Sequence, residues 1–304
     1  MSNNTPIRIK TISAFHALRN LPSPEHPLIS IVRAEDIRDA RTPVTLVQDY
    51  YSISLKRNFK GKFRYGQQQY DFDEGLMVFV APGQVFRIEH GPDETDAQTG
   101  WLLLVHPDFL WNTPLAKTIR QYEFFGYAVA EALFLSEKEE ATMVNILQNI
   151  QDEYHANIDA FSQGIIIAQL ETLLRYSQRF YQRQFITRRI SNHQVLERLS
   201  LLLDEYFAQD DLVNKGLPSV QYISNALNLS PGYLSGLLKT LTGQSTQQHI
   251  HEKLIEKAKE QLSTTTLSVS EIAYALGFGH PQSFSKLFKT KTTLSPLEFR
   301  QSFN

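Results

Sequence analysis

The sequence predicts a two-domain protein of the α+β class, in which short strands and two long helices precede an all-helical C-terminal part. Three observations support this prediction. The 304 residues exceed what one compact core usually holds. The spacing of apolar residues changes near Ser136 from that of strands to that of helices. After residue 194 the helical pattern contains a stretch that occurs twice, which indicates a duplicated structural unit.

Residues 44–110 contain several short runs of β-branched and aromatic residues, some with the alternation of a half-buried strand. Turn residues such as Pro82-Gly83 separate these runs. The expected strands are 44–47, 51–55, 62–65, 75–80 and 101–106. Strands at this spacing are typical of a β-sandwich or a small barrel.

Two long helices are expected after the strands. Ser136 and Glu139 have the spacing of a capping box, which marks the start of a helix. An apolar face follows, made of Met143, Ile146, Leu147, Ile150 and Tyr154. A second helix at about 161–181 carries a stripe of Ile166, Leu170, Leu173, Leu174, Ser177 and Tyr181. The two stripes fit either a lid over the strands or a dimer seam.

The stretch 182–193 is polar and basic, which suits a linker or a frayed helix end. We therefore divide the chain into a first domain at 1–185, a linker at 186–193 and a second domain at 194–304. Although the net charge is −2, residues 1–214 hold 21 basic and 27 acidic side chains, and residues 215–304 hold nine basic and five acidic. This asymmetry favours a polyanionic partner for the C-terminal part.

The duplicated unit lies at 219–245 and recurs 49 to 50 positions later with eleven identical pairs. Each copy reads as helix, short turn, helix. Ser219 and Ser268 begin the first helices, and Asn228 and Gly277 stand where the chain needs a left-handed residue. This is the plan of a helix-turn-helix, whose second helix enters the major groove of DNA. The alternative, a helical solenoid, usually needs three or more units.

Composition and motifs exclude several classes of protein. The 42% hydrophobic and 20% charged residues are those of a folded globular protein. The chain has no cysteine, which excludes disulfides and thiolate catalysis. No apolar run reaches the about 20 residues of a membrane helix, and the first residues lack the apolar block of a secretory signal. We expect a cytoplasmic protein without membrane contact.

The second copy and the residues after it resemble a known family. Residues 269–278 read Val-Ser-Glu-Ile-Ala-Tyr-Ala-Leu-Gly-Phe, 283–289 read Ser-Phe-Ser-Lys-Leu-Phe-Lys, and 295–300 read Ser-Pro-Leu-Glu-Phe-Arg. Together with 229–235 and 239–245 of the first copy, these runs are similar to the C-terminal signature of AraC/XylS-type transcription regulators. The resemblance covers about 100 residues of the chain.

The resemblance implies a sequence-specific DNA-binding regulator that is not an enzyme and holds no cofactor. It also implies a cupin-like effector-binding and dimerisation domain at 1–185, a match carried by Gly75, Pro82-Gly83 and 101–107. The expected partners are double-stranded DNA, a small-molecule effector, a second copy of the chain and, for an activator, RNA polymerase. The expected location is the nucleoid. The effector, the operator and the direction of regulation stay open.

The candidate DNA-binding residues lie on the second helix of each copy. In the second copy the outward positions are His280, Gln282, Ser283, Ser285, Lys286 and Lys289, with Lys291 beyond. The resemblance places base reading at Pro281, Gln282, Ser285 and Lys286, although Pro281 departs from the family's usual polar residue. In the first copy the candidates are Gly232, Tyr233, Ser235, Gly236 and Lys239. At its two glycine positions the family commonly has larger residues that contact bases. This copy therefore either contacts mainly phosphate or approaches the bases closely.

No metal site or ligand-binding residue is assigned. A catalytic cupin needs a His-x-His cluster and a later His, but Phe86 stands at the later position and His90 and His106 are isolated. The alternative function, a cupin enzyme whose helical tail docks a partner, therefore lacks its metal ligands. The strands are rich in aromatic residues that fit a pocket or a core, and three arginines near them suit an anion. These residues are Tyr50, Tyr51, Phe59, Phe63, Tyr65, Phe79, Phe86, Arg57, Arg64 and Arg87.

Overall fold

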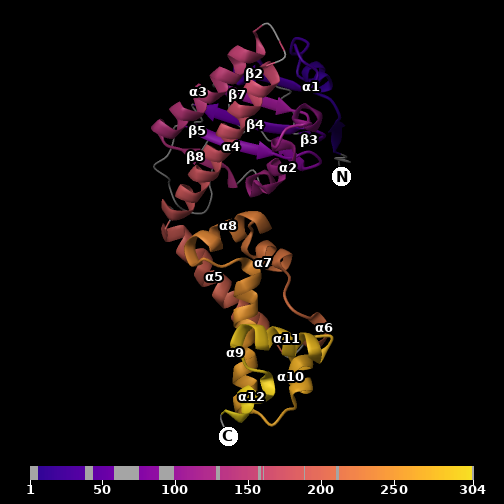
Figure 1. Ribbon diagram of the computed structural model, residues 1–304, viewed down its shortest axis with the longest axis vertical. Coiled ribbons are helices and arrows are strands. Elements are labelled where there is room, and N and C mark those ends of the chain that lie inside the picture. Colours follow the sequence, from indigo (N-terminus) through magenta and orange to yellow (C-terminus); the bar gives the residue numbers. More distant parts are fainter. Residues whose placement is uncertain are drawn as a thin grey trace. The chain divides into compact units, whose positions relative to one another are not determined.

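The computed structural model divides the chain into two compact units, Met1–Gln184 and Phe185–Asn304. It describes residues 6–37, 44–57, 75–88, 99–127, 131–156, 159, 161–187, 189–209 and 212–302, without the side chains of 44, 86–88 and 189–193. Figure 1 shows strands in the first unit and only helices in the second. The predicted α+β class is confirmed, and the division at 1–185, 186–193 and 194–304 stays a prediction.

The first unit contains two sheets. The larger sheet is antiparallel and has the order β2 (Ile29–Arg33), β7 (Thr99–Val105), β4 (Tyr51–Arg57), β5 (Gly75–Val80) and β8 (Leu133–Leu135). In the smaller sheet, β3 (Val44–Gln48) pairs in parallel with β1 (Ile7–Ile9) and antiparallel with β6 (Val85–Ile88). The described strands leave both sheets open, so the cupin-like barrel stays a prediction. The expected strand 62–65 lies outside the described residues.

Short helices connect and flank these strands. Their bounds are α1 (Ile12–Leu18), η1 (Ala34–Asp36), η2 (Pro107–Leu110), α2 (Leu115–Thr118), η3 (Ile119–Gln121) and η4 (Glu123–Gly126). At the centre of the larger sheet Leu55 pairs with both Met77 and Trp101, and all three side chains are buried. Burial of this kind is the main contribution to the stability of the unit.

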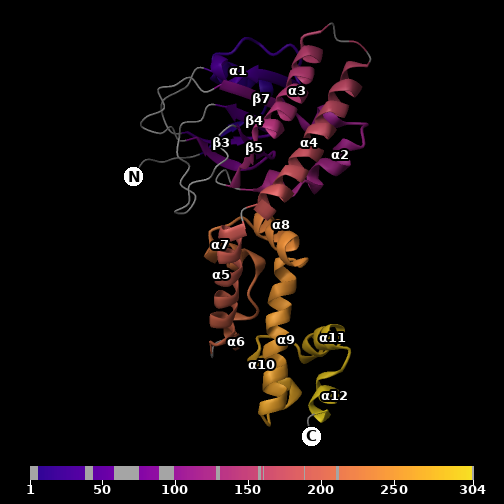
Figure 2. The ribbon, with the colours of Figure 1, turned by 90° about the vertical axis from the view of Figure 1, so that its left-hand side faces the viewer.

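Two long helices lie across the larger sheet: α3 (Glu137–Tyr154) and α4 (Ser162–Thr187) (Figure 2). The capping box of Ser136 and Glu139 at the start of α3 is confirmed. Both predicted stripes are buried, and Leu170 and Leu173 are no more than 1% exposed within the single chain. The stripes are therefore covered by the molecule's own core, which favours the lid over the dimer seam.

The end of α4 is bound to β8 by side-chain hydrogen bonds. Gln184 is fully buried, accepts a hydrogen bond from the amide of Phe134 at 2.8 Å and donates one to the carbonyl of Ala132 at 3.2 Å. Arg183 donates to the carbonyl of Phe134 at 2.7 Å and forms a salt bridge of 2.6 Å with Glu139. These contacts fix the last turns of α4 on the edge of the sheet.

The second unit consists of eight helices within its described residues. They are α5 (Arg189–Phe207), α6 (Leu212–Lys215), α7 (Val220–Leu227), α8 (Pro231–Thr242), α9 (Thr246–Thr264), α10 (Val269–Ala275), α11 (Pro281–Thr292) and α12 (Pro296–Gln301). Helices α7 and α8 form the first predicted copy, α10 and α11 form the second, and α9 joins them. The predicted linker 186–193 lies in α4 and α5, apart from residue 188, which is outside the described residues.

No helix in the described ranges is long and apolar enough to span a membrane.

Candidate nucleic-acid interface

The helix starts and turns of both copies follow from local hydrogen bonds. Ser219 caps α7, and Ser230 caps α8 with Pro231 at its first position. Ser268 and Glu271 form the predicted capping box of α10. Hydrogen bonds from the backbone and side chain of Ser268 lower the pKa of the Glu271 carboxyl.

The turns of both copies contain a left-handed residue. The φ angles are 58° at Asn228 and 85° at Gly277, as the sequence predicts. Only glycine and, less often, asparagine adopt this conformation readily. Each turn therefore places its second helix at an angle to the first, with one face outward.

Apolar side chains hold each copy together. In the first copy the buried residues are Ile223, Leu227, Leu234, Leu237 and Leu238, and in the second they are Ile272, Ala273, Leu276, Phe284 and Phe288. Phe278 and Leu287 are half-buried, and the Phe278 ring contacts that of Phe284 at a centroid distance of 5.4 Å. The rings of Phe288 and Phe299 lie 5.5 Å apart, so α12 supports α11 from behind. The two inward faces leave the opposite faces of α8 and α11 as candidate DNA-contacting surfaces.

The outward face of α11 is polar and cationic. On this face Gln282, Ser283, Lys286 and Lys289 are exposed and Pro281 and Ser285 are half-buried, with the exposed His280 at the N-cap. Lys291 is exposed as well, but it lies half a turn around the helix from Gln282, on the side where its charge acts on His251 of α9. Within the described part of the chain, none of the three lysines forms a salt bridge with a carboxylate. Ammonium groups that are not neutralised by the protein can replace the counterions of DNA phosphates. The structure thus brings the second-copy candidates other than His280 and Lys291 to one face of α11, where polar and cationic side chains suit the bases and phosphates of DNA.

The outward face of α8 differs from that of α11. Lys239 is exposed, and Gly232, Ser235 and Gly236 are half-buried. The expectation that Tyr233 faces outward is wrong, because its side chain is 5% exposed and its ring contacts that of Phe185 at 5.0 Å. Tyr233 lies one helical turn before Leu237 and so belongs to the edge of the buried stripe. A side chain in this position is a packing residue of the unit.

Comparison with known proteins identifies the family. The helix-turn-helix domain family matches residues 223–302. The transcriptional activator RhaS of Enterobacter sp. (strain 638) is 30% identical over 254 residues, which cover 83% of this chain and 86% of RhaS. The chain belongs to the AraC/XylS family of transcription regulators. As a member of this family, it is a DNA-binding regulator of transcription.

Two further similar proteins match a smaller part of this AraC/XylS regulator. The transcriptional regulatory protein YesN of Bacillus subtilis (strain 168) is 38% identical over 94 residues, and these span only 26% of YesN. The crystal structure of the C-terminal domain of yesN from Fusobacterium nucleatum is 30% identical, with a TM-score of 0.31, and covers 35% of this chain and 98% of that one.

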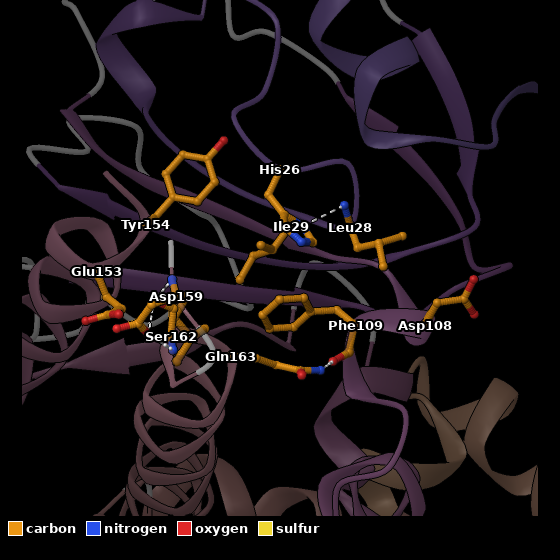
Figure 3. A pocket seen from close by; sticks show the side chains of 11 residues that line it. His26, Leu28, Ile29, Asp108, Phe109, Glu153, Tyr154, Asp159, Ser162 and Gln163 are labelled. Atoms are coloured by element: carbon orange, nitrogen blue, oxygen red, sulfur yellow. Dashed lines mark hydrogen bonds between the residues drawn. The ribbon is translucent and has the colours of Figure 1, made fainter. Parts of the chain in front are cut away.

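The first unit of the regulator contains a cavity of about 340 Å³ between the start of β2, η2 and the facing ends of α3 and α4 (Figure 3). The ring of His26 stands edge-on to that of Phe109 at 5.5 Å, and burial lowers the pKa of this histidine. Gln163 donates a hydrogen bond to the carbonyl of Phe109 at 2.7 Å. The carboxylate of Asp159 accepts from the amides of Phe161 and Ser162 and so caps α4.

Sequence reasoning missed this cavity because its lining comes from three stretches that are far apart in the chain, at 26–29, 108–109 and 153–166. The residues expected near a ligand lie elsewhere: Tyr50, Tyr51 and Phe79 are buried, and Arg57 pairs with the buried carboxylate of Glu140. The side chains of Phe59, Phe63, Arg64, Tyr65, Phe86 and Arg87 lie outside the described residues.

The two histidines considered as metal ligands do not form a centre with other residues in the described ranges. His106 accepts a hydrogen bond from the amide of Asp108 at 3.3 Å and caps η2, and His90 lies outside those ranges. The described residues contain no group of three or more His, Cys, Asp or Glu side chains placed to hold a metal ion.

Proposed function

We propose that this regulator recognises a two-part DNA site and reads base sequence mainly with α11, while α8 binds chiefly the phosphate backbone. The observation that carries the proposal is the difference at two aligned positions. Gln282 and Lys286 are exposed on α11, where α8 has Gly232 and Gly236. A glutamine can bind adenine with two hydrogen bonds, and a lysine can donate to guanine. A glycine has no side chain with which to recognise a base.

Lysines at matching positions suit the phosphates in both halves of the site. Lys239 and Lys289 are aligned by the repeat, and both are exposed near the end of their helices. Since α9 joins the two copies, α8 and α11 can enter successive major grooves about 34 Å apart on one side of the duplex. The asymmetry between the copies then gives one half-site a strict base sequence and the other a loose one.

The selection of bound sequences from a random DNA pool tests this division. Gln282→Ala and Lys286→Ala should each cost about 1–3 kcal/mol of binding and relax the preference at particular base pairs. The matched control Lys289→Ala should weaken binding to all sequences alike. An unchanged selected motif in both Gln282→Ala and Lys286→Ala, together with a motif altered by Ser235→Ala, would contradict the proposal.

The first unit is proposed as a cupin-like sensor and dimerisation domain that responds to a small-molecule effector. Support comes from its two sheets, from the helical lid and from the length of the match to RhaS, which reaches well beyond the helix-turn-helix domain. We further propose that the regulator acts as a homodimer at the nucleoid, contacts RNA polymerase if it activates, and has no enzymatic activity. Sedimentation of the whole chain at micromolar concentration tests the dimer, and a monomer would contradict it.

A further inference from the structure

A short segment before the first copy packs against the turn of the second copy. This segment, Leu212–Gly216, consists of α6 and the glycine after it, and we refer to it as the strut. The amide of Gly216 donates to the carbonyl of Leu212 at 2.8 Å, and the Leu212 side chain is 3% exposed. In Figure 1 the strut lies beside α10, and the chain then returns to the start of α7. The strut therefore touches one copy and leads directly into the other.

The contact between the strut and the second copy is a close approach of two backbones. A Cβ atom at Gly277 would lie 3.0 Å from the carbonyl carbon of Gly216 and 3.0 Å from the carbonyl oxygen of Leu212. Real Cβ atoms are rarely found so close to backbone atoms. Any side chain at position 277 would thus push the strut away from the second copy.

The first copy provides an internal control for the role of this glycine. Its turn has the same left-handed conformation, but the residue is Asn228, which carries a Cβ and is exposed. A positive φ angle alone is therefore compatible with asparagine in this fold. What distinguishes position 277 is the strut beside it, so Gly277 serves the contact as well as the turn.

Tyr206, near the end of α5, links the strut to the first copy. Its hydroxyl donates to the carbonyl of Gly216 at 3.0 Å, and its ring stands edge-on to that of Tyr222 on α7 at 5.2 Å. Helix α5 also packs along both α7 and α9, and its Asp204 forms a salt bridge with Lys253 on α9. The two copies are thus connected at a second place, in addition to the covalent connection through α9.

We propose that the strut fixes the angle between α8 and α11 and so determines the spacing and phase of the two half-sites that the regulator accepts. Each copy packs on one end of α9, through α8 in the first copy and through α10 and α12 in the second. A change of the angle between the copies therefore requires α9 to bend or twist, and the strut adds a contact away from α9 that resists this. Inserting one base pair between two half-sites rotates one relative to the other by about 35°. If the angle between α8 and α11 is fixed, the two helices cannot both bind the rotated half-sites. If the two copies can turn relative to each other, both helices can bind. This inference rests on the proposal that both helices enter the groove.

The test compares full-length variants on DNA whose half-sites are at the selected spacing or one base pair further apart. The quantity measured is the spacing ratio, the affinity for the selected spacing divided by the affinity for the lengthened site. In the wild type this ratio should be about ten or more, because one half-site loses its base contacts on the lengthened site. Gly277→Asn introduces the residue of the first copy and should reduce the ratio to about three or less. Leu212→Ala loosens the strut from its other side and should have the same effect, even if Gly277→Asn fails to fold. Tyr206→Phe should shift the ratio in the same direction to a smaller extent.

The matched control is Asn228→Gly, which alters the corresponding turn where no strut lies and should keep the wild-type ratio. If both Gly277→Asn and Leu212→Ala keep the spacing ratio of the wild type, the inference about the strut is overturned. The proposal of a two-part DNA site would be unaffected by this outcome. A wild type that selects a single half-site would overturn both proposals. Relaxed spacing with unchanged base preference in each half-site would support the strut, since a damaged α11 would lose its base preference as well.

Discussion

The two helix-turn-helix copies are alike on their buried faces and differ on their outward ones. Ile223 and Ile272 occupy the same buried position, whereas Gly232 and Gly236 of α8 stand where α11 exposes Gln282 and Lys286. The copies also differ where one of them contacts a segment that does not belong to it, as at Gly277, which lies beside the strut. A position that distinguishes two copies of one unit thus indicates a contact that only one of them makes.

Tyr233 and Ser283 give the clearest example, because they are aligned by the repeat and have opposite surroundings. The tyrosine is buried against Phe185, and the serine is exposed. In the first copy this position therefore packs against Phe185, at the start of the second unit, and is not available for contact with DNA. The second copy keeps that position available for DNA, which fits its larger proposed share in base reading.

The largest effect is expected for Tyr233→Ser, which gives the first copy the residue of the second. Loss of the buried ring should lower the free energy of unfolding of the second unit by about 3 kcal/mol. The control Ser283→Ala should change it by less than about 0.5 kcal/mol. Hydrogen exchange of the α8 and α11 amides measures both, since the two tryptophans, Trp101 and Trp111, lie in the first unit. Equal losses in the two variants would show that the copies are interchangeable at this position.

A smaller effect is expected on the salt dependence of DNA binding. Each phosphate contact contributes about 0.9 to the slope of log affinity against log salt concentration. Lys289→Ala in the second copy and Lys239→Ala in the first should therefore each reduce the slope by about one unit. Binding of a labelled duplex between low and physiological salt gives these slopes. If only one of the two variants lowers the slope, the two lysines do not make equivalent phosphate contacts.

The smallest effect is expected on the stability of α10 at acidic pH. The pKa of Glu271 is lowered in the folded state by its hydrogen bonds with Ser268, so its contribution to stability is present above the usual pKa of 4.5 and is lost as the pH falls below it. In the first copy Tyr222 occupies the corresponding position, so α7 has no such carboxylate. The stability difference between the wild type and Glu271→Gln should therefore shrink between pH 7 and pH 4 in α10, as measured by hydrogen exchange. A difference that does not depend on pH would contradict this assignment.

Local signals in the sequence predicted the second unit well. The caps at Ser219, Ser230 and Ser268 and the left-handed turns at Asn228 and Gly277 depend on residues within one or two helical turns of each other. Such hydrogen bonds and φ angles are determined by the chain nearby. The repeat strengthened the prediction because each pattern could be read twice.

Contacts between distant segments could not be predicted in the same way. The burial of Tyr233 depends on Phe185, which lies 48 positions earlier, and the role of Gly277 depends on Gly216, 61 positions earlier. In the first unit, β1, β2, β6 and β8 are short, and their pairing partners fix them more than their own composition does. The cavity beside Phe109 likewise forms only when three separate stretches of the chain meet.

The hydrogen bonds between the end of α4 and β8 have a consequence for the behaviour of the protein at high concentration. Strand β8 is the last strand of its sheet, and an exposed sheet edge is a template for association with another chain. Here the outward amide and carbonyl of Phe134 are already occupied by Gln184 and Arg183, and the carbonyl of Ala132 is occupied by Gln184. The helix thus takes the place that a strand from a second molecule would fill, and protects this edge of the sheet against aggregation.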